Sequence, residues 1–398
     1  MILQKLTCVP VKILTRILLI ISVLTGCHST KQFIQPEQPF VFPCPASSVT
    51  KKLPLKPERL IPLVSIASVG DIMLGNHTIY YIEKYGVDYP FDSTRSILAG
   101  TYVTFGNLES PFTKTGRQFD KRFTFKTPPE YAISLVNAGF DVVTLANNHI
   151  LDYGIEGLKN TINILDSIGL GYCGAGLTQE QAQRPAILER NGCRIAFLGY
   201  TMTFPEEFWA MDSTGGTNYP YKMSSSIQHI DSLADFTIVT FHWGAESRNY
   251  PKEYQKVFAH RAIDYGADLV LGHHPHVLQG LEIYKNRLIA YSLGNFSFSS
   301  YSRKATESII LKAYLSDNGL LFAKIIPISV NNIKVAFQPQ ILHGAAADTV
   351  ISHLRKYSKP LNSTNIIDNN GYIWGERYIP ADSLDNKQMN QGCPAETN

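Results

Sequence analysis

Apolar runs of strand length alternate with segments of helical spacing through the central part of the chain. The β-rich run Val64–Val69 ends at Gly70-Asp71, and later apolar runs of similar length cover residues 102–105, 141–146, 195–200, 236–241 and 268–271. Amphipathic helix spacing covers residues 129–138, 154–168 and 253–265. Gly139 directly after the first of these is a common helix stop. This alternation predicts an α/β architecture with helices outside the sheets.

The pattern changes in the last third of the chain. From residue 281 onward, strand follows strand, including the runs 288–292 and 309–314. This succession predicts a second, more antiparallel sheet. Residues 346–398 are polar and irregular, so we expect a domain over residues 61–345 followed by a C-terminal extension, either packed or mobile.

The N-terminus has the pattern of an export signal. Basic residues at positions 5, 12 and 16 precede a short apolar run at 17–24 and then Thr25-Gly26-Cys27. The run is shorter than the roughly 20 residues that span a membrane. Residues 24–27 also resemble a bacterial lipobox. We therefore expect a lipoprotein signal peptide at 1–27 and lipidation of Cys27, which would anchor the exported protein to the cell membrane or the outer membrane. An ordinary signal peptide or an uncleaved anchor are the alternatives.

A proline-rich segment follows Cys27. Prolines at this density do not sustain a helix and favour an extended, semi-rigid chain, so residues 28–60 are expected to be a tether. The alternative is an irregular segment packed on the domain. Disulfides persist in an exported protein, and Cys173 and Cys193, near two adjacent predicted strands, are candidates for one. Geometry decides whether they pair.

Composition narrows the function classes. A hydrophobic content of 44% with 17% charged residues indicates a globular chain with a sizeable core. The net charge is only +3, and no Lys/Arg block stands out. Nucleic acid is therefore not an expected partner.

Polar side chains follow the predicted strands at the points where they end. They are Asp71, Asn107, Glu109, Asn147, Asn148, His149, His242, His273, His274 and His276. The carboxyl ends of strands in an open α/β sheet share one edge, where ligands bind. Oxygen and imidazole groups without thiolate are typical ligands of a divalent metal. Each piece alone also fits a turn, a cap or a structural histidine, but together they predict a metal site.

The spacing of one motif adds to this prediction. In His274-Pro275-His276, alternate residues of an extended segment point the same way, which would direct both imidazoles to one site.

The order of these pieces resembles the metallophosphoesterase (calcineurin-like) superfamily. More specifically, six segments resemble the motifs of CapA, the poly-γ-glutamate capsule-synthesis family: Ser68–Gly75, Gly106–Pro111, Leu145–Gly154, His242–Glu246, Gly272–Val277 and Tyr291–Phe296. The resemblance covers roughly residues 64–300. It implies a four-layer α/β/β/α sandwich, in which two sheets are flanked by helices.

The resemblance also implies roles for single residues. Asp71 and His276 are expected to bind a first metal, Glu109 to bridge, and Asn148, His242 and His274 to bind a second. His149 is expected beside the metals as a general acid or charge stabiliser oriented by Asp152. The implied cofactor is one or two divalent ions of manganese, iron or zinc.

Two positions depart from the superfamily pattern. Met73 stands where a histidine is usual, and a thioether is a poor ligand for such cations. Glu109 stands where aspartate is usual. The first metal site is therefore expected to be weak, open or absent, unless His77 compensates.

Further residues are candidates for binding the substrate. Arg122 and Lys126 follow the second motif and would hold an anionic substrate, although solvated loop charges explain them as well. Trp243 and Glu246 follow a predicted ligand and are candidates to line the pocket. Core packing is an equally good explanation of Trp243.

Two functions fit these observations. The first is a metal-dependent hydrolase that cleaves a phosphoester, or an amide bond of a surface polymer. The second is a non-catalytic subunit that binds an anionic polymer such as poly-γ-glutamate and supports its synthesis, export or anchoring. Other membrane-bound capsule-synthesis proteins are expected partners of either. A solute receptor for a transporter also fits a lipoprotein, but the motifs argue against it.

Overall fold

The computed structural model describes residues 63–376. The expected signal peptide, Cys27 and the tether lie outside these residues, as do residues 377–398 of the expected C-terminal extension. Among the helices of residues 63–376, none combines the length and apolar character needed to cross a membrane.

The first sheet has nine strands. Its main path runs β16-β15-β14-β1-β2-β3-β4, while β13 pairs with β1 and β17 with β15. The strands are β1 Val64–Met73, β2 Val103–Leu108, β3 Val142–Thr144, β4 Gly171–Cys173, β13 Asn295–Phe298, β14 Glu307–Ser316, β15 Gly319–Ser329, β16 Gln340–Ile341 and β17 Tyr372–Trp374. The pairs from β1 to β4 are parallel, whereas β14 pairs with β1 antiparallel.

The second sheet has six strands in the order β11-β12-β10-β9-β7-β6. They are β6 Ala186–Arg190, β7 Cys193–Thr201, β9 Phe236–His242, β10 Leu269–His273, β11 Leu281–Tyr284 and β12 Arg287–Ala290. The four central strands are parallel, and the two outer ones are antiparallel to their neighbours. A further pair joins β5 Ala175–Gly176 to β8 Gly216–Thr217.

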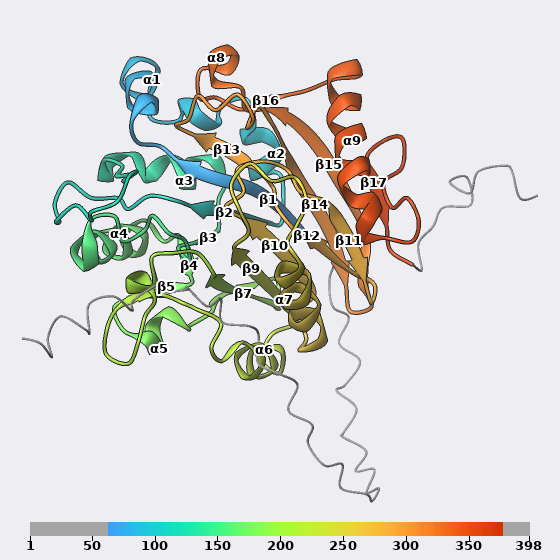
Figure 1. The fold of residues 1–398 in the computed structure, drawn as a ribbon, viewed down its shortest axis with the longest axis horizontal. Coiled ribbons are helices and arrows are strands. Elements are labelled where there is room, and N and C mark those ends of the chain that lie inside the picture. The colour runs from blue at the N-terminus through green and yellow to red at the C-terminus, as the bar shows by residue number, and fades with distance from the viewer. Residues whose placement is uncertain (1–62, 377–398) are drawn as a thin grey trace, which may run out of the picture. The chain divides into compact units, whose positions relative to one another are not determined.

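Helices flank both sheets. They are α1 His77–Tyr85, α2 Arg95–Ala99, α3 Ile133–Ala138, α4 Gly154–Ile168, α5 Gln179–Ala182, α6 Met223–Asp231, α7 Glu253–Asp264, α8 Asn332–Val335 and α9 Gly344–Ser358. Short 3-10 turns lie at Tyr89–Phe91, Pro129–Tyr131, Glu206–Phe208 and Lys359–Leu361. Figure 1 shows α6 and α7 beside the second sheet and α9 beside β15 and β17.

Three hydrophobic clusters define the layers. In β1, Ile66 packs between the two sheets with Phe197 of β7, while its neighbour Ala67 faces the other way, toward α3 and α4. A third cluster lies between the second sheet and the helices α6 and α7. Successive strand residues point to opposite faces, so each strand contributes to two layers. The expected four-layer α/β/β/α sandwich is confirmed.

Several expectations change in detail. The helix α4 has the predicted bounds, and Gly139 ends α3 in the left-handed conformation, with a φ of 95°. The late antiparallel strands β14 to β17, however, extend the first sheet, because β14 pairs with β1 instead of starting a separate sheet. The possible Cys173–Cys193 disulfide is not formed, since Cys173 is a buried free thiol.

Residues beyond 345 pack against the domain as far as they are described. In α9, Val350, Ile351 and Leu354 join the cluster between the sheets, and β17 pairs with β15. Ser358, at the end of α9, accepts a hydrogen bond from the backbone of Leu281 at 2.9 Å.

Candidate metal site

The carboxyl ends of β1 and β2 bring two acidic side chains together. Asp71 lies at a register shift in β1, and its N–H donates to the carbonyl of Gly294 at 3.0 Å. A Cβ atom at Gly70 would lie 1.9 Å from that same carbonyl, so only glycine permits this approach. The N–H of Glu109 donates to the carbonyl of Ile72 at 2.8 Å, which holds the end of β2 beside β1.

Asn107 joins the two acids. Its Nδ2 donates to Asp71 Oδ1 at 2.8 Å and to Glu109 Oε2 at 3.2 Å. Its Oδ1 accepts from Asn147 Nδ2 at 3.0 Å. All four side chains are fully buried. Asn107 therefore fixes one oxygen of each acid and leaves the other oxygen directed elsewhere.

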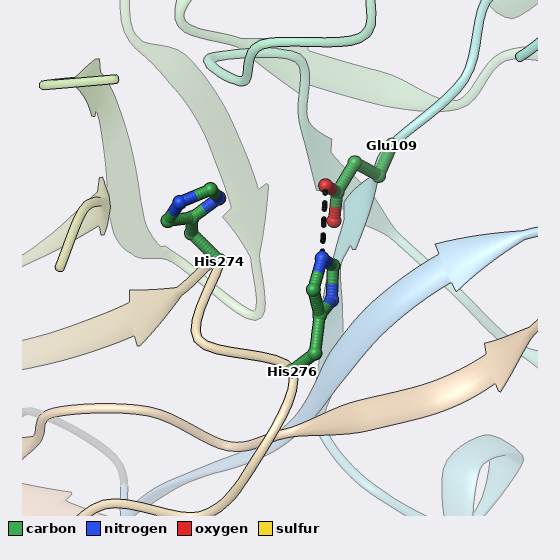
Figure 2. A group of neighbouring side chains, drawn as sticks. All are labelled: Glu109, His274 and His276. Carbon is green, nitrogen blue, oxygen red and sulfur yellow. Dashed lines mark ion pairs between the residues drawn. The ribbon is translucent and has the colours of Figure 1, made fainter. Parts of the chain in front are cut away.

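Histidines from the second sheet lie opposite these acids. His242, at the end of β9, has its Nε2 3.6 Å from Glu109 Oε1 and 2.8 Å from Asn148 Oδ1. His276 has its Nδ1 3.0 Å from Asp71 Oδ2 and its Nε2 3.8 Å from Glu109 Oε1. Figure 2 shows this last contact, with the ring of His274 at the side of the pair. The ring centres of His242 and His274 lie 4.8 Å apart.

The turn after β10 directs His274 and His276 in a way that differs from the expectation. The segment is not extended, because His274 has a φ of 94° and His276 a φ of 58°. Left-handed backbone is strained for residues other than glycine and tends to occur at functional sites. The convergence of the two imidazoles thus comes from a turn, not from the two-residue repeat of a strand.

Several buried polar atoms at this edge make no hydrogen bond within the described residues. They are Asp71 Oδ2, Glu109 Oε1, His274 Nδ1 and both ring nitrogens of His273. Unpartnered buried polar atoms are costly and rare in folded proteins. Their presence together indicates that the chain alone does not complete this site.

The donor set and its spacing fit a divalent cation. One ligand atom from each of Glu109, His274 and His276 lies within 4.8 Å of the others, and the same holds for Asp71, Glu109 and His242. Two ligand atoms that each lie about 2.1 Å from a metal are roughly 3–3.5 Å apart. The distances from Glu109 Oε1 to the nearest nitrogens of His242 and His276 are slightly longer than this. These five residues, with Asn148, would hold the metal.

Burial keeps two histidines in the form that binds a metal but favours a proton on Glu109 when no cation is bound. Burial lowers the pKa of His242 well below its ordinary value and that of His274 to about 3, so both imidazoles are neutral. Burial also raises the pKa of Glu109 well above its usual range, and the nearby charge of Asp71 adds to this. Neutral imidazole is the form that binds a metal.

Asp71 and His276 behave as a charged pair in the absence of a metal. Burial alone would raise the pKa of Asp71, but His273 and His276 hold it well below its ordinary value. Burial alone would lower the pKa of His276, but Glu109 and Asp71 raise it to about 10.

His149 and Asp152 form the expected pair beside the site. His149 Nδ1 lies 2.8 Å from Asp152 Oδ2, and the ring of Phe125 stacks on His149 at 4.1 Å. Lys121, which the sequence did not single out, completes the group, with its Nζ 2.5 Å from Asp152 Oδ1. Its Nζ also donates to the carbonyl of Asn148. Asp152 is fully buried, so this cation offsets its charge.

Three of the residues predicted to bind the substrate are exposed. Arg122 and Lys126 are exposed and lie over the rings of Phe123 and Tyr153. Glu246 is exposed, and its charge acts on Glu109 and His276.

Trp243 does not line a pocket. It is buried in the core next to the helices α6 and α7, stacks on Phe241, and donates from Nε1 to the carbonyl of Tyr291 at 2.9 Å. Because successive residues of a strand point to opposite faces, a site-facing His242 directs Trp243 away.

Two further histidines differ from expectation. His77 does not compensate for Met73, because its ring packs against Tyr301 at 5.0 Å. His273, in contrast, is fully buried, and its Nδ1 lies 3.3 Å from Asp71 Oδ1. His273 pairs in register with His242 on the neighbouring strand, and this pairing identifies His273 as a residue of the site.

Comparison with known proteins finds a family and several relatives. The family "Bacterial capsule synthesis protein PGA_cap" matches residues 65–300. The capsule biosynthesis protein CapA of Bacillus anthracis is 33% identical over 277 residues, which cover 67% of this chain and 67% of that protein. The PGA biosynthesis protein CapA of Bacillus subtilis (strain 168) is 33% identical over 301 residues, covering 74% and 79%. A probable polyglutamine synthesis accessory protein of Mycobacterium tuberculosis is 28% identical over 223 residues, covering 52% and 59%.

Proposed function

Since the chain belongs to the bacterial capsule synthesis protein family PGA_cap, we propose that it acts in capsule biosynthesis as a metal-dependent hydrolase of a surface polymer. The names of its relatives in Bacillus support the capsule role. The proposed substrate is a phosphoester, or else poly-γ-glutamate or a similar anionic polymer in which the bond cleaved is an amide.

One observation carries the proposal of hydrolysis. Carboxylate and imidazole atoms from both sheets converge in a buried edge, where Glu109 Oε1 and His274 Nδ1 make no hydrogen bond within the described residues. If these side chains served only the fold, their polar atoms would be expected to form hydrogen bonds within the chain. Buried ligand atoms that make no hydrogen bond favour a bound cation.

The side chains around the cation site have separable tasks. A bound divalent ion would polarise a phosphoryl or carbonyl oxygen as a Lewis acid. Asn107 holds Asp71 and Glu109 in their orientations. Asp152, which as a carboxylate only accepts, holds the proton of His149 on Nδ1 and leaves Nε2 for proton exchange with the substrate.

A non-catalytic role in polymer binding is the second candidate, and Met73 favours it. Met73 is fully buried where the superfamily has a ligand, and His77 packs elsewhere. The first metal then has fewer strong ligands than a two-metal hydrolase uses.

The place of action is also part of the proposal. We infer an exported protein that a lipid on Cys27 anchors to the cell membrane or the outer membrane, on the strength of the N-terminal pattern. Anchoring would place the domain beside membrane-bound capsule-synthesis proteins, which are the proposed partners.

The test is metal content and turnover of the purified protein and two variants. His274→Ala removes a proposed ligand. His353→Ala is the matched control, because His353 on α9 pairs with Glu307 at 2.8 Å and has no part in the site. Elemental analysis measures the metal after loading with manganese, iron or zinc. A generic phosphodiester and poly-γ-glutamate serve as substrates.

We expect near-stoichiometric metal and turnover in the wild type and the control, and loss of both in His274→Ala. Metal without turnover of either substrate would support the non-catalytic role. No metal in the wild type under any loading condition would contradict the hydrolase and the assignment of the metal ligands.

A further inference from the structure

A band of exposed aromatic side chains begins next to the metal site. It consists of His77, Tyr80, Tyr81, Tyr85, Tyr89 and Tyr301, here called the tyrosine strip. Tyr80, Tyr85 and Tyr301 are 59%, 56% and 48% exposed. Large contiguous groups of exposed rings are unusual on a soluble surface and mark binding sites.

The rings form one ordered array. The rings of Tyr81, Tyr85 and Tyr89 stack with centres 5.1–6.4 Å apart and planes within 24° of parallel. Buried Phe337 supports the array, contacting Tyr81 at 5.4 Å and Tyr301 at 5.2 Å. A hydrogen bond of 2.9 Å from the Tyr89 hydroxyl to the carbonyl of Ala336 holds the end of the stack. Such an array presents its surface without ordering new side chains on binding.

The strand β13 makes the strip continuous with the metal site. At its start, Asn295 lies 2.9 Å from His276 Nδ1, and at its end the ring of Phe298 lies 4.8 Å from the ring of His276. The next residue, Ser299, accepts from the N–H of Thr78 in α1, and Tyr301 then contacts His77. The strip and the metal site are therefore joined through the buried residues of β13 and Ser299.

The exposed charges along this surface are mainly positive. The cations on α1, on the loop after β13 and on α8 are Lys84, Arg303, Lys304 and Lys334. Within residues 63–376 none of the four forms an ion pair with a carboxylate. Glu83 is the exposed acid of α1, and its charge acts on Tyr131 of a different segment. The surface thus complements a negatively charged ligand.

From the rings and the charges together, we propose that the tyrosine strip binds an acidic polysaccharide. The apolar faces of sugar rings stack on tyrosines, the phenol hydroxyls bond to sugar hydroxyls, and the carboxylates pair with the lysines and arginine. Poly-γ-glutamate would use the cations but has no ring to stack. A membrane surface fits less well, because inserting helices expose Trp, Phe and Leu, whereas the exposed rings here are phenols and an imidazole. The inference rests on the proposed role in making a surface polymer.

The test measures binding of the purified full-length protein to alginate, a polysaccharide of uronic acids. The variants are Tyr85→Ser with Tyr301→Ser, and Tyr250→Ser as the matched control, since Tyr250 is 46% exposed outside the strip. We expect the double variant to bind roughly tenfold more weakly or worse, equivalent to about 1.4 kcal/mol. The control should bind as the wild type does, and thermal melting should show that all variants fold.

Further probes separate the alternatives. Binding of poly-γ-glutamate should not change in the double variant, and vesicles with anionic lipid should not bind in preference to alginate. Equal alginate binding by the wild type and the double variant would overturn the inference. So would wild-type protein that binds only poly-γ-glutamate or only vesicles. Alginate binding should persist in His274→Ala, so failure of the proposed hydrolysis would leave this result intact.

Discussion

Two buried aspartates at opposite ends of the strands have different surroundings. Asp268 lies just before β10, where its Oδ2 accepts from the N–H of Thr237 at 3.0 Å and its Oδ1 from Arg287 Nε at 3.0 Å. Asp71 lies at the carboxyl end of β1, where Oδ1 accepts from Asn107 and Oδ2 lies 3.0 Å from His276 Nδ1. The partners of Asp268 belong to the fold, whereas Asp71 lies among other proposed metal ligands. The difference separates a carboxylate that serves the fold from one that awaits a ligand.

The pKa values of the two groups show the same contrast. Burial raises the pKa of Asp268 to about 6, against the opposing effects of Thr237 and Arg287. The pKa of Asp71 stays well below its ordinary value despite burial, because two histidines lie beside it. Asp71 therefore remains charged, as a metal ligand must.

The largest effect should come from the metal site at the carboxyl ends of the strands. We expect Glu109→Gln to weaken metal binding by on the order of a hundredfold or more, since even the partners of metal ligands contribute 10–100-fold. Glu109 contributes to both groups of converging ligand atoms, and an amide carries no charge. Titration with Mn²⁺ or Zn²⁺ measures the affinity. Asp268→Asn is the matched control and should bind as the wild type does; equal weakening in both variants would contradict the comparison.

A smaller effect is expected at Asp268, at the opposite end of the strands. Asp268→Ala should lower the free energy of unfolding by about 2 kcal/mol, because it leaves the guanidinium of Arg287 and a buried N–H without their partner. Arg287 is partly exposed, which keeps the loss below that of a fully buried pair. Urea unfolding measures it. Metal content should not change, and a variant as stable as the wild type would show that Asp268 does not support the fold.

The third expected effect is a pH dependence of stability. Since burial raises the pKa of Asp268 above that of the unfolded chain, the folded state binds the proton more tightly. The stability contribution of this group is therefore greatest below the unfolded pKa of about 3.9 and declines as the pH rises to about 6, by at most about 1.4 kcal/mol per pH unit.

Asp268→Asn should remove this decline, because an amide does not titrate in this range. Unfolding of both proteins between these pH values gives the comparison. Parallel stability curves would mean that Asp268 titrates equally in the folded and unfolded chains.

Some features of the site followed from strand periodicity and others did not. Asp71, Glu109, His242, His274 and His276 were expected at one edge, because strand ends in an α/β sheet collect there. Lys121 was not expected, since its neighbour Arg122 has the same charge. Only the packing of the loop shows which of the two turns toward Asp152.

Of the two explanations of Trp243, core packing is the one that the structure bears out. Consecutive residues of an extended chain point to opposite faces, so naming His242 as a ligand already favoured packing for the residue that follows it. His273 is different, because its position depends on the register between β9 and β10, which pairs it with His242. Register is a property of two strands and cannot be obtained from either one alone.

The sequence by itself determined the alternation of strands and helices, the family and the residue types at the strand ends, because periodicity and motifs are local. Only the tertiary structure decided that the late strands extend the first sheet and that a left-handed turn brings His274 toward His276. It also decided that Glu109 Oε1 and His274 Nδ1 make no hydrogen bond within the described residues, while both carboxylate oxygens of Asp268 accept one. These features depend on contacts between segments far apart in the chain, whose geometry is set when the two sheets pack together.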